Sequence, residues 1–284
     1  MPRFGQLVIG PAGCGKSTYC SIIQKHCEAI KRQVSVLNLD PAAEYFDYEP
    51  IADVKNLIQD ESLKLGPNGG LIFCMEFLYQ NLDWLDEAIG DDDGDYILFD
   101  CPGQIELYSH LNIMPRIVEH LMNKWDFRFV TVFILDARFL VDSSHFLAGV
   151  LAALSSMSAF STPHVNVMSK LDLLSEKKEK HVIARYMEPD MTEFFGDSSD
   201  DCDNDTNTAS MGSKFFRLSK ALADIVSRYS LVQFMPLNRE KEETIEAIML
   251  QIDTCLQYDE EVDPRNRLYD EAEQEMYGFG DDSR

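Results

Sequence analysis

The sequence predicts an α/β protein with a doubly wound, mostly parallel sheet that carries helices on both faces. Two observations predict this class: short apolar runs alternate with segments of helical length such as 16–31 and 213–229, and most of the runs are continuously apolar. Continuous runs are typical of strands buried on both faces. The expected strands are 6–10, 34–39, 96–99, 129–135, 164–168 and 231–235.

Several of the expected strands end at a polar or charged residue. The first strand ends at Gly10, the second at Asp40, the third at Asp100, the fourth at Asp136 and the fifth near Lys170. Ligands of open α/β sheets bind at the carboxyl ends of the strands. We therefore expect the functional residues to gather at one edge of the sheet.

The domain organisation follows from the segments between the strands. We expect one domain over residues 1–258 and an acidic flexible tail over 259–284. Residues 41–95 exceed a minimal connection and are expected to form an insertion containing helices. Residues 196–213 are acidic and have no hydrophobic period, which is typical of a disordered loop.

Composition excludes several classes of function. The 284 residues contain 25 Lys and Arg against 49 Asp and Glu, a net charge of −24, which disfavours direct binding of nucleic acid or of an anionic membrane. The chain shows neither a long apolar span nor a signal-peptide layout at its start. The 7 Cys are scattered, which favours a reducing compartment such as the cytoplasm, without disulfides or zinc.

Residues 10–17 read Gly-Pro-Ala-Gly-Cys-Gly-Lys-Ser and match the phosphate-binding pattern G-x-x-x-x-G-K-S between an expected strand and helix. Glycines are needed because a loop that wraps phosphates leaves no room for Cβ atoms. Lys16 places a cation on the outer phosphates, and Ser17 offers a hydroxyl to Mg²⁺. The expected nucleotide ligands here are Gly13, Cys14, Gly15, Lys16, Ser17 and Thr18. The motif therefore predicts a P-loop NTPase.

The third strand closes with Asp100-Cys-Pro-Gly-Gln104. Asp100 can hold Mg²⁺ through water, Gly103 places a backbone amide where a γ-phosphate would sit, and Gln104 can orient the attacking water. Taken alone, the Pro-Gly pair is equally consistent with a strand-ending turn. Downstream of a phosphate loop, it predicts a nucleotide-sensing switch.

Asp40 is a third carboxylate at the same expected edge. It is a candidate to hold a metal-bound water or the attacking water, and the alternative is a cap or turn residue before Pro41. The expected metal ligands are Ser17, Asp40 and Asp100.

Ser169-Lys170-Leu171-Asp172 follows the fifth strand and resembles a guanine-binding motif in which asparagine is commonest at the first position. The Asp172 carboxylate can accept hydrogen bonds from guanine N1–H and the 2-amino group, whereas adenine would leave it unpaired. The Lys170 stem can lie along the base or buttress the phosphate loop. The alternative is an ordinary strand-to-helix turn with a surface lysine.

Between Asp40 and Asp100 lie Gly66-Pro67-Asn68 and two further glycines. Together with residues 38–44 and 99–107, this stretch resembles the GPN-loop GTPases, and the similarity extends over residues 1–258. The resemblance implies a GTP hydrolase that uses GTP, GDP and Mg²⁺. It also implies a dimer in which the loop Gly66, Pro67 and Asn68 reaches the partner's site, so that Asn68 acts in trans near the γ-phosphate or the attacking water. The expected catalytic residues are Asp40, Gln104 and Asn68.

The resemblance further implies partners and a place in the cell. Eukaryotic members pair with the first paralogue of the family or with themselves, and they assist assembly and nuclear import of RNA polymerase II. A cytoplasmic protein that shuttles to the nucleus is the corresponding expectation. Because the sequence offers no obvious arginine finger in cis, we expect slow hydrolysis.

Two alternative functions stay open at this point. One is a P-loop kinase acting on a nucleotide or polynucleotide, although the region 173–214 is poor in arginine and offers no basic lid. The other is a non-catalytic module in which nucleotide only stabilises a dimer. The apolar segment 146–160 is expected to be a core helix, with a helix at a dimer or client interface as the alternative.

Overall fold

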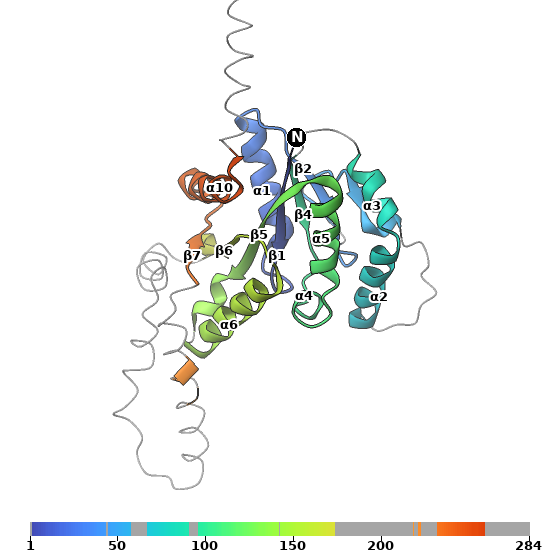
Figure 1. Cartoon of the computed structure of the whole chain (residues 1–284). Coiled ribbons are helices and arrows are strands. Elements are labelled where there is room, and N and C mark those ends of the chain that lie inside the picture. The colour runs from blue at the N-terminus through green and yellow to red at the C-terminus, as the bar shows by residue number, and fades with distance from the viewer. Residues whose placement is uncertain are drawn as a thin grey trace, which may run out of the picture.

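The computed structural model describes residues 2–43, 45–57, 67–90, 96–141, 143–173 and 232–258, together with residues 218, 221 and 222. Seven parallel strands form one sheet in the order β3-β2-β4-β1-β5-β6-β7 (Figure 1). The strands are β1 (Arg3–Ile9), β2 (Ser35–Asn38), β3 (Ala52–Asp53), β4 (Tyr96–Asp100), β5 (Phe127–Asp136), β6 (His164–Ser169) and β7 (Phe234–Pro236). The predicted doubly wound α/β class is confirmed.

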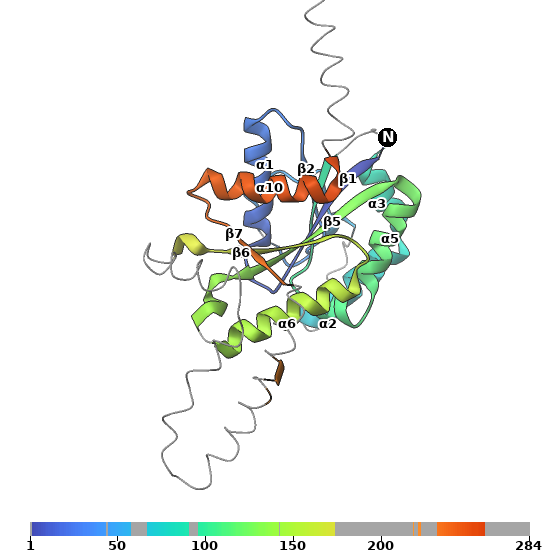
Figure 2. The same cartoon turned by 60° about the vertical axis from the view of Figure 1, so that its left-hand side comes forward.

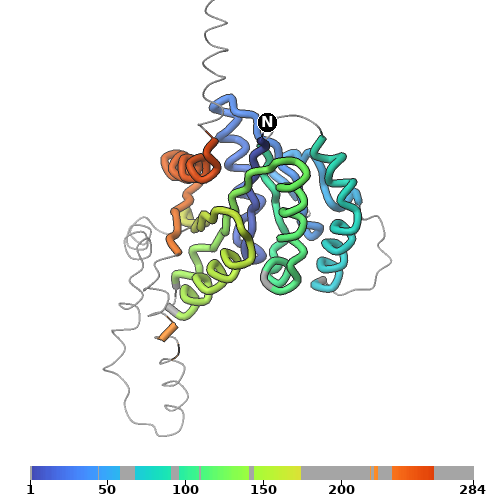
Figure 3. Tube along the Cα trace, in the orientation of Figure 1, coloured from blue at the N-terminus to red at the C-terminus, as the bar shows by residue number. Residues whose placement is uncertain are grey.

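Helices cover both faces of the sheet. The described helices are α1 (Lys16–Ala29), α2 (Pro67–Gln80), α3 (Leu82–Ile89), α4 (Glu106–Ser109), α5 (Ile113–Trp125), α6 (Ser143–Ala159) and α10 (Glu242–Leu256), with 3₁₀ turns η1 (Val54–Asn56), η2 (Ala137–Val141) and η3 (Leu171–Leu173). Helices α1 and α10 lie on one face and α2, α3, α5 and α6 on the other (Figures 2 and 3). Within these ranges no helix has the length and apolar content that a bilayer crossing needs.

The central strand β1 explains the continuous apolar runs. Leu7 and Ile9 pack into the core that contains Ile117 of α5, whereas Val8 packs into the core that contains Ile23 of α1. Successive side chains of a strand point to opposite faces, and both faces are covered here. A central strand of this sheet is therefore mostly apolar on both sides, and its buried polar residues, such as Gln6, have hydrogen-bond partners.

The six predicted strands are all present, but the prediction lacks β3. Strands β1, β4, β5 and β6 are longer than predicted, and β2 and β7 are shorter. A two-residue strand leaves no readable hydrophobic pattern, and only its register with β2 identifies it. Strands β4 and β5 extend through Asp100 and Asp136, because both carboxylate residues pair with neighbouring strands. The predicted disordered loop 196–213, the tail 259–284 and most of the predicted helix 213–229 lie outside the described residues.

Within the predicted insertion 41–95, the described residues contain β3, η1, α2 and α3. The buried Asp86 of α3 attaches this part to α5. Its carboxylate accepts hydrogen bonds from Lys124 Nζ at 2.6 Å and from Trp125 Nε1, and His120 Nε2 lies 3.2 Å away. These contacts hold α3, and with it the end of α2, against the core of the domain.

Helix α6 contains all of the apolar segment 146–160 except its last residue. Phe146, Val150 and Ala153 are fully buried under the sheet, while Leu151 on the other side of the helix is 36% exposed. The expected core helix is therefore confirmed. A role of its outer side at a dimer or client interface stays a prediction.

Candidate nucleotide-binding site

The phosphate loop joins β1 to α1 at the carboxyl edge of the sheet. Gly10 has a φ of 145°, and a Cβ there would lie 2.3 Å from the Ile134 carbonyl oxygen. Gly15 precedes the first turn of α1 with a φ of 98°, in the left-handed region that favours glycine. The strand, loop and helix required by the motif are therefore all present, and the helix begins at the lysine of the motif.

Lys16 and Cys14 are both buried in this loop. Lys16 is buried, and its Nζ donates a hydrogen bond to the Pro11 carbonyl at 3.4 Å across the loop. Burial raises the pKa of the Cys14 thiol to about 11, so the thiol stays neutral and packs in the core. The loop thus directs one cation, rather than a reactive thiolate, towards the place of the phosphates.

Gly103 lies directly against the phosphate loop. A Cβ on Gly103 would come within 2.8 Å of Ala12 Cα, 3.0 Å of Ala12 N and 3.0 Å of Lys16 Nζ. The turn after β4 and the loop after β1 are therefore in contact. This contact places Gly103 beside Lys16. The expected position of its amide at the γ-phosphate stays a prediction.

Gly103→Ala is expected to lower GTP hydrolysis about tenfold, because the new methyl group displaces Ala12 and Lys16 from their positions. A steady-state assay of phosphate release measures the effect. Gly90→Ala is the control, since Gly90 has a φ of 72° and open space around it, at the other end of the sheet. It strains the backbone without touching the loop, so equal losses in both variants would contradict the prediction.

Asp100 is fully buried at the end of β4. Its Oδ2 accepts a hydrogen bond from the Tyr48 hydroxyl at 2.7 Å, whereas its Oδ1 is buried without a hydrogen-bond partner among the described residues. Burial raises the pKa of the carboxyl above its ordinary value, and hydrogen bonds from Ser17 and Tyr48 offset part of the rise. The site thus holds a desolvated oxygen beside the Ser17 hydroxyl.

These oxygens fit a magnesium ion. Mg²⁺ prefers hard oxygen ligands and is usually held by one or two protein groups together with substrate phosphates. Ser17 and the unpaired oxygen of Asp100 provide such groups next to the phosphate loop. In this site Mg²⁺ would neutralise charge on the outer phosphates.

Asp40 lies in a turn after β2. Its Oδ1 accepts a hydrogen bond from the Ala42 amide at 2.9 Å, and its own amide donates to Asn38 Oδ1 at 3.0 Å. Asn38 in turn donates to Asp53 Oδ1 at 2.8 Å and so connects β2 to β3. Asp40 therefore stabilises the turn before Pro41, which was the alternative interpretation of this residue. Its expected role in holding a metal-bound or attacking water stays a prediction.

Asn68 and Gln104 meet in one chain. Gln104 Nε2 donates a hydrogen bond to Asn68 Oδ1 at 2.7 Å, although the residues are 36 positions apart. Asn68 lies in the first turn of α2, and Gln104 follows the glycine that contacts the phosphate loop. Gly66 lies outside the described residues, and Pro67 begins the helix. Two of the three predicted catalytic side chains are thus brought together beside the phosphate loop.

Lys170 buttresses the phosphate loop. Its Nζ donates hydrogen bonds to the Gly13 carbonyl at 2.5 Å and to Asp136 Oδ2 at 2.8 Å. The Ser169 hydroxyl, in the place where asparagine is commonest, donates to the Cys14 carbonyl at 2.5 Å. The segment after β6 is therefore fastened to two successive carbonyls of the loop.

Asp136 was seen in the sequence only as the end of a strand and was given no role. Its side chain is 3% exposed and pairs with both Lys170 and Arg138. Burial acts to raise the pKa of Asp136, but hydrogen bonds from Arg138 and Lys170 outweigh it and hold the pKa below its ordinary value. The sequence signal that could have identified Asp136 as a site residue is its position at the end of a buried strand, like that of Asp100.

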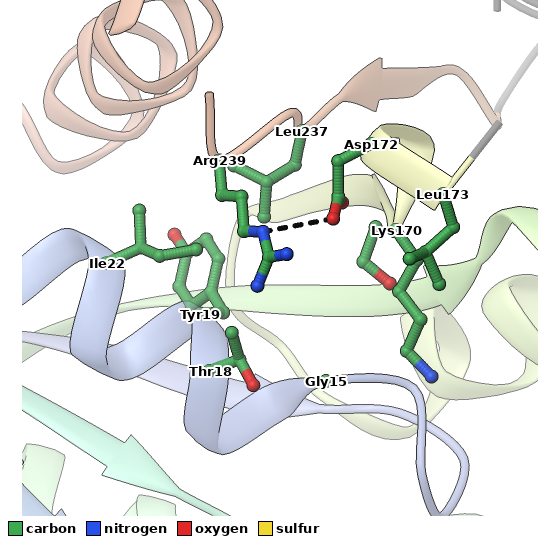
Figure 4. A pocket seen from close by; sticks show the side chains of 10 residues that line it. Gly15, Thr18, Tyr19, Ile22, Lys170, Asp172, Leu173, Leu237 and Arg239 are labelled. Carbon is green, nitrogen blue, oxygen red and sulfur yellow. Dashed lines mark ion pairs between the residues drawn. The ribbon is translucent and has the colours of Figure 1, made fainter. Parts of the chain in front are cut away.

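A cavity of about 200 Å³ opens between α1, the segment after β6 and the segment after β7 (Figure 4). Asp172 lies on its wall, where Asp172 Oδ2 is 3.0 Å from Arg239 Nε. The cavity is lined by Gly15, Thr18, Tyr19, Ile22, Ser169, Lys170, Asp172, Leu173, Leu237 and Arg239. It lies next to the phosphate loop and combines apolar walls with one carboxylate, which suits a guanine base.

Comparison with known proteins gives consistent results. A family model described as "Conserved hypothetical ATP binding protein" matches residues 8–258. GPN-loop GTPase 3 of Danio rerio is 49% identical over 269 residues, which cover 93% of this chain and 91% of the relative. GPN-loop GTPase 3 of Xenopus tropicalis is 45% identical over 282 residues, which cover 96% and 95%.

A solved structure supports the fold. The apo form of PAB0955, a GTPase from Pyrococcus abyssi, superposes with a TM-score of 0.67 and 21% identity, covering 89% of this chain and 97% of the other. On the family model and the relatives together, the chain belongs to the GPN-loop GTPase family.

Proposed function

We propose that this GTPase is a slowly hydrolysing dimeric switch that assists assembly and nuclear import of RNA polymerase II. The observation that carries the catalytic part is the contact between Asn68 and Gln104. It joins the residue that characterises the GPN loop to the residue suited to orient water. Both lie beside Gly103, which packs on the phosphate loop.

The residues divide the reaction between them. The loop amides and Lys16 bind the triphosphate, and Ser17 and Asp100 would hold Mg²⁺, which would neutralise phosphate charge. Gln104 orients a water molecule for in-line attack on the γ-phosphorus, and the Gly103 amide binds a γ-phosphate oxygen. As the new P–O bond forms, the bond from the γ-phosphorus to the bridging oxygen breaks, GDP leaves, and the water passes a proton to phosphate or solvent. Lys16 is the buried cation of the loop, and the Asn68 amide adds no second positive charge. Because the negative charge of the transition state is then stabilised less than by an added arginine, the hydrolysis is slow.

Dimerisation completes the site in this proposal. In a single chain Asn68 bonds to its own Gln104. In the dimer, with the first paralogue of the family or with a second copy, Asn68 leaves this bond and reaches the partner's γ-phosphate or attacking water. The exchange frees Gln104 for its own water molecule, so hydrolysis requires the assembled dimer.

Substitution of these two residues tests the catalytic part. Gln104→Leu and Asn68→Ala are each expected to lower hydrolysis in the assembled dimer at least about tenfold while nucleotide affinity stays within about twofold. Single-turnover phosphate release measures the rate. Gln80→Leu, an equal change at the exposed end of α2, is the control. Undiminished hydrolysis in both variants would contradict the catalytic roles proposed for Gln104 and Asn68.

A different experiment tests the partners and the place in the cell. The full chain, tagged at native levels, is purified from cytoplasmic and nuclear fractions, and companion chains and bound nucleotide are identified by mass spectrometry. Polymerase subunits and a family paralogue are expected in both fractions. Their absence from both would contradict the proposed role, even if GTP hydrolysis is confirmed.

A further inference from the structure

Arg239 occupies the cavity that receives the base. Figure 4 shows its guanidinium group reaching from the segment after β7 towards Asp172, above the first turns of α1. Arg239 Nε lies 3.0 Å from Asp172 Oδ2, and the two side chains are 59% and 11% exposed. The carboxylate expected to bind guanine thus already has a donor from its own chain.

The two donors have the same chemistry. The edge of guanine that bears N1–H and the 2-amino group contains a guanidine unit, with neighbouring N–H groups directed the same way. An arginine side chain presents the same planar arrangement of N–H donors and matches a carboxylate for the same reason. Asp172 cannot pair fully with both, so base and arginine compete for it.

Hydrogen bonds fix the backbone on both sides of Arg239. The Leu237 amide donates to the Met168 carbonyl at 2.8 Å, and the Glu240 amide donates to the buried Asn238 side chain at 2.9 Å. Thr244 Oγ1 also donates to the Asn238 carbonyl at 3.0 Å. Because the turn is held on both sides of Arg239, the exposed side chain is the part that can swing out.

We propose that Arg239 is an internal competitor of guanine: it pairs with Asp172 when the base is absent, and guanine must displace it to bind. The inference rests on the proposed role of Asp172 in guanine binding. It adds that Asp172 keeps a donor after the base leaves, so release of the nucleotide does not leave a largely buried carboxylate without a partner. Arg239 thereby weakens guanine nucleotide binding and favours exchange.

Removing the competitor tightens binding. Partly exposed ion pairs are weak, so Arg239→Ala is expected to lower the Kd for a ribose-labelled fluorescent GDP by about threefold to fivefold at about 50 mM salt. The gain shrinks at about 500 mM salt, because screening weakens the competing pair. Fluorescence titration and stopped-flow dissociation of the full chain with Mg²⁺ measure both.

Two further variants complete the experiment. Lys25→Ala removes one positive charge from an exposed position on α1 and is expected to bind GDP like the parent chain. In an Asp172→Ala background, Arg239→Ala is expected to change the Kd by less than about 1.5-fold, because the competition needs the carboxylate.

The outcomes separate this inference from the proposed site. If Asp172→Ala alone leaves the Kd unchanged, the proposed guanine site is wrong. If Asp172→Ala weakens binding but Arg239→Ala weakens it too, or leaves it unchanged at low salt, Arg239 is not a competitor. If Arg239→Ala lowers the Kd equally in the parent chain and in the Asp172→Ala background, the inference is overturned as well.

Discussion

Asp100→Asn is expected to stabilise the nucleotide-free protein while it lowers GTP hydrolysis about 100-fold. The two effects have one cause. Asp100 is fully buried, and its Oδ1 has no hydrogen-bond partner among the described residues. The fold tolerates a desolvated carboxylate there, and the carboxylate is a better partner for Mg²⁺ and its waters than a neutral amide.

The pH dependence follows from the sign of the pKa shift. Burial raises the pKa of Asp100 above its ordinary value of 3.8, so the folded state binds the proton more tightly than the unfolded state does. The folded protein therefore loses stability as the pH rises through the raised pKa. At pH 7 the asparagine variant should have a higher free energy of unfolding than the parent, and the difference should shrink towards pH 4.

Denaturant unfolding without nucleotide or Mg²⁺ measures the stability, and phosphate release with both measures the activity. Asp47→Asn is the matched control, because it makes the same change at an exposed position one residue before Tyr48. It should leave both quantities unchanged. A destabilised Asp100→Asn variant would show that the hydrogen bond from Tyr48 outweighs the cost of the buried charge.

Asp172→Asn is expected to weaken GTP binding about 10³-fold and to create binding of xanthosine triphosphate. Guanine presents two donors, N1–H and the 2-amino group, to the carboxylate. An asparagine amide offers one acceptor and one donor, so its NH₂ group faces the 2-amino group of guanine without an acceptor. Xanthine carries a carbonyl oxygen in place of the 2-amino group and accepts from that NH₂.

Competition against a fluorescent guanine nucleotide, with guanosine, xanthosine and adenosine triphosphates as competitors, measures the change. The parent chain should rank guanosine first and the variant xanthosine first. Because the substitution leaves the phosphate loop intact, hydrolysis of xanthosine triphosphate should approach the parent's rate with GTP. Unchanged preference for guanosine would show that the base does not bind at Asp172.

Local sequence was sufficient for much of this site. Lys16 and Ser17 were predicted because the phosphate loop is one continuous segment whose glycines and length match its task. Asp100 and Lys170 were predicted because parallel strands end at a common edge, so a residue at the end of a buried run is placed by the sheet alone. The register that pairs Val8 with Asp100 confirms this reasoning.

Contacts between side chains from separate segments were not predictable in the same way. Tyr48 reaches Asp100 across 52 residues, Asp136 holds Lys170 across 34, and Arg239 approaches Asp172 from a segment beyond β7. A turn residue such as Tyr48 has no hydrophobic period to mark its direction. Its partner depends on how the segment after β2 folds back over the sheet.

The amino-acid sequence by itself determined the class of fold, the phosphate loop and the edge of the sheet where chemistry occurs, because hydrophobic period and glycine placement act over a few neighbouring residues. Only the tertiary structure decided which side chains form hydrogen bonds or ion pairs with one another: Gln104 with Asn68, Lys170 with Asp136 and Asp172 with Arg239. Hydrogen bonds and ion pairs form over about 3 Å, and that distance is set by sheet register and helix packing rather than by separation along the chain.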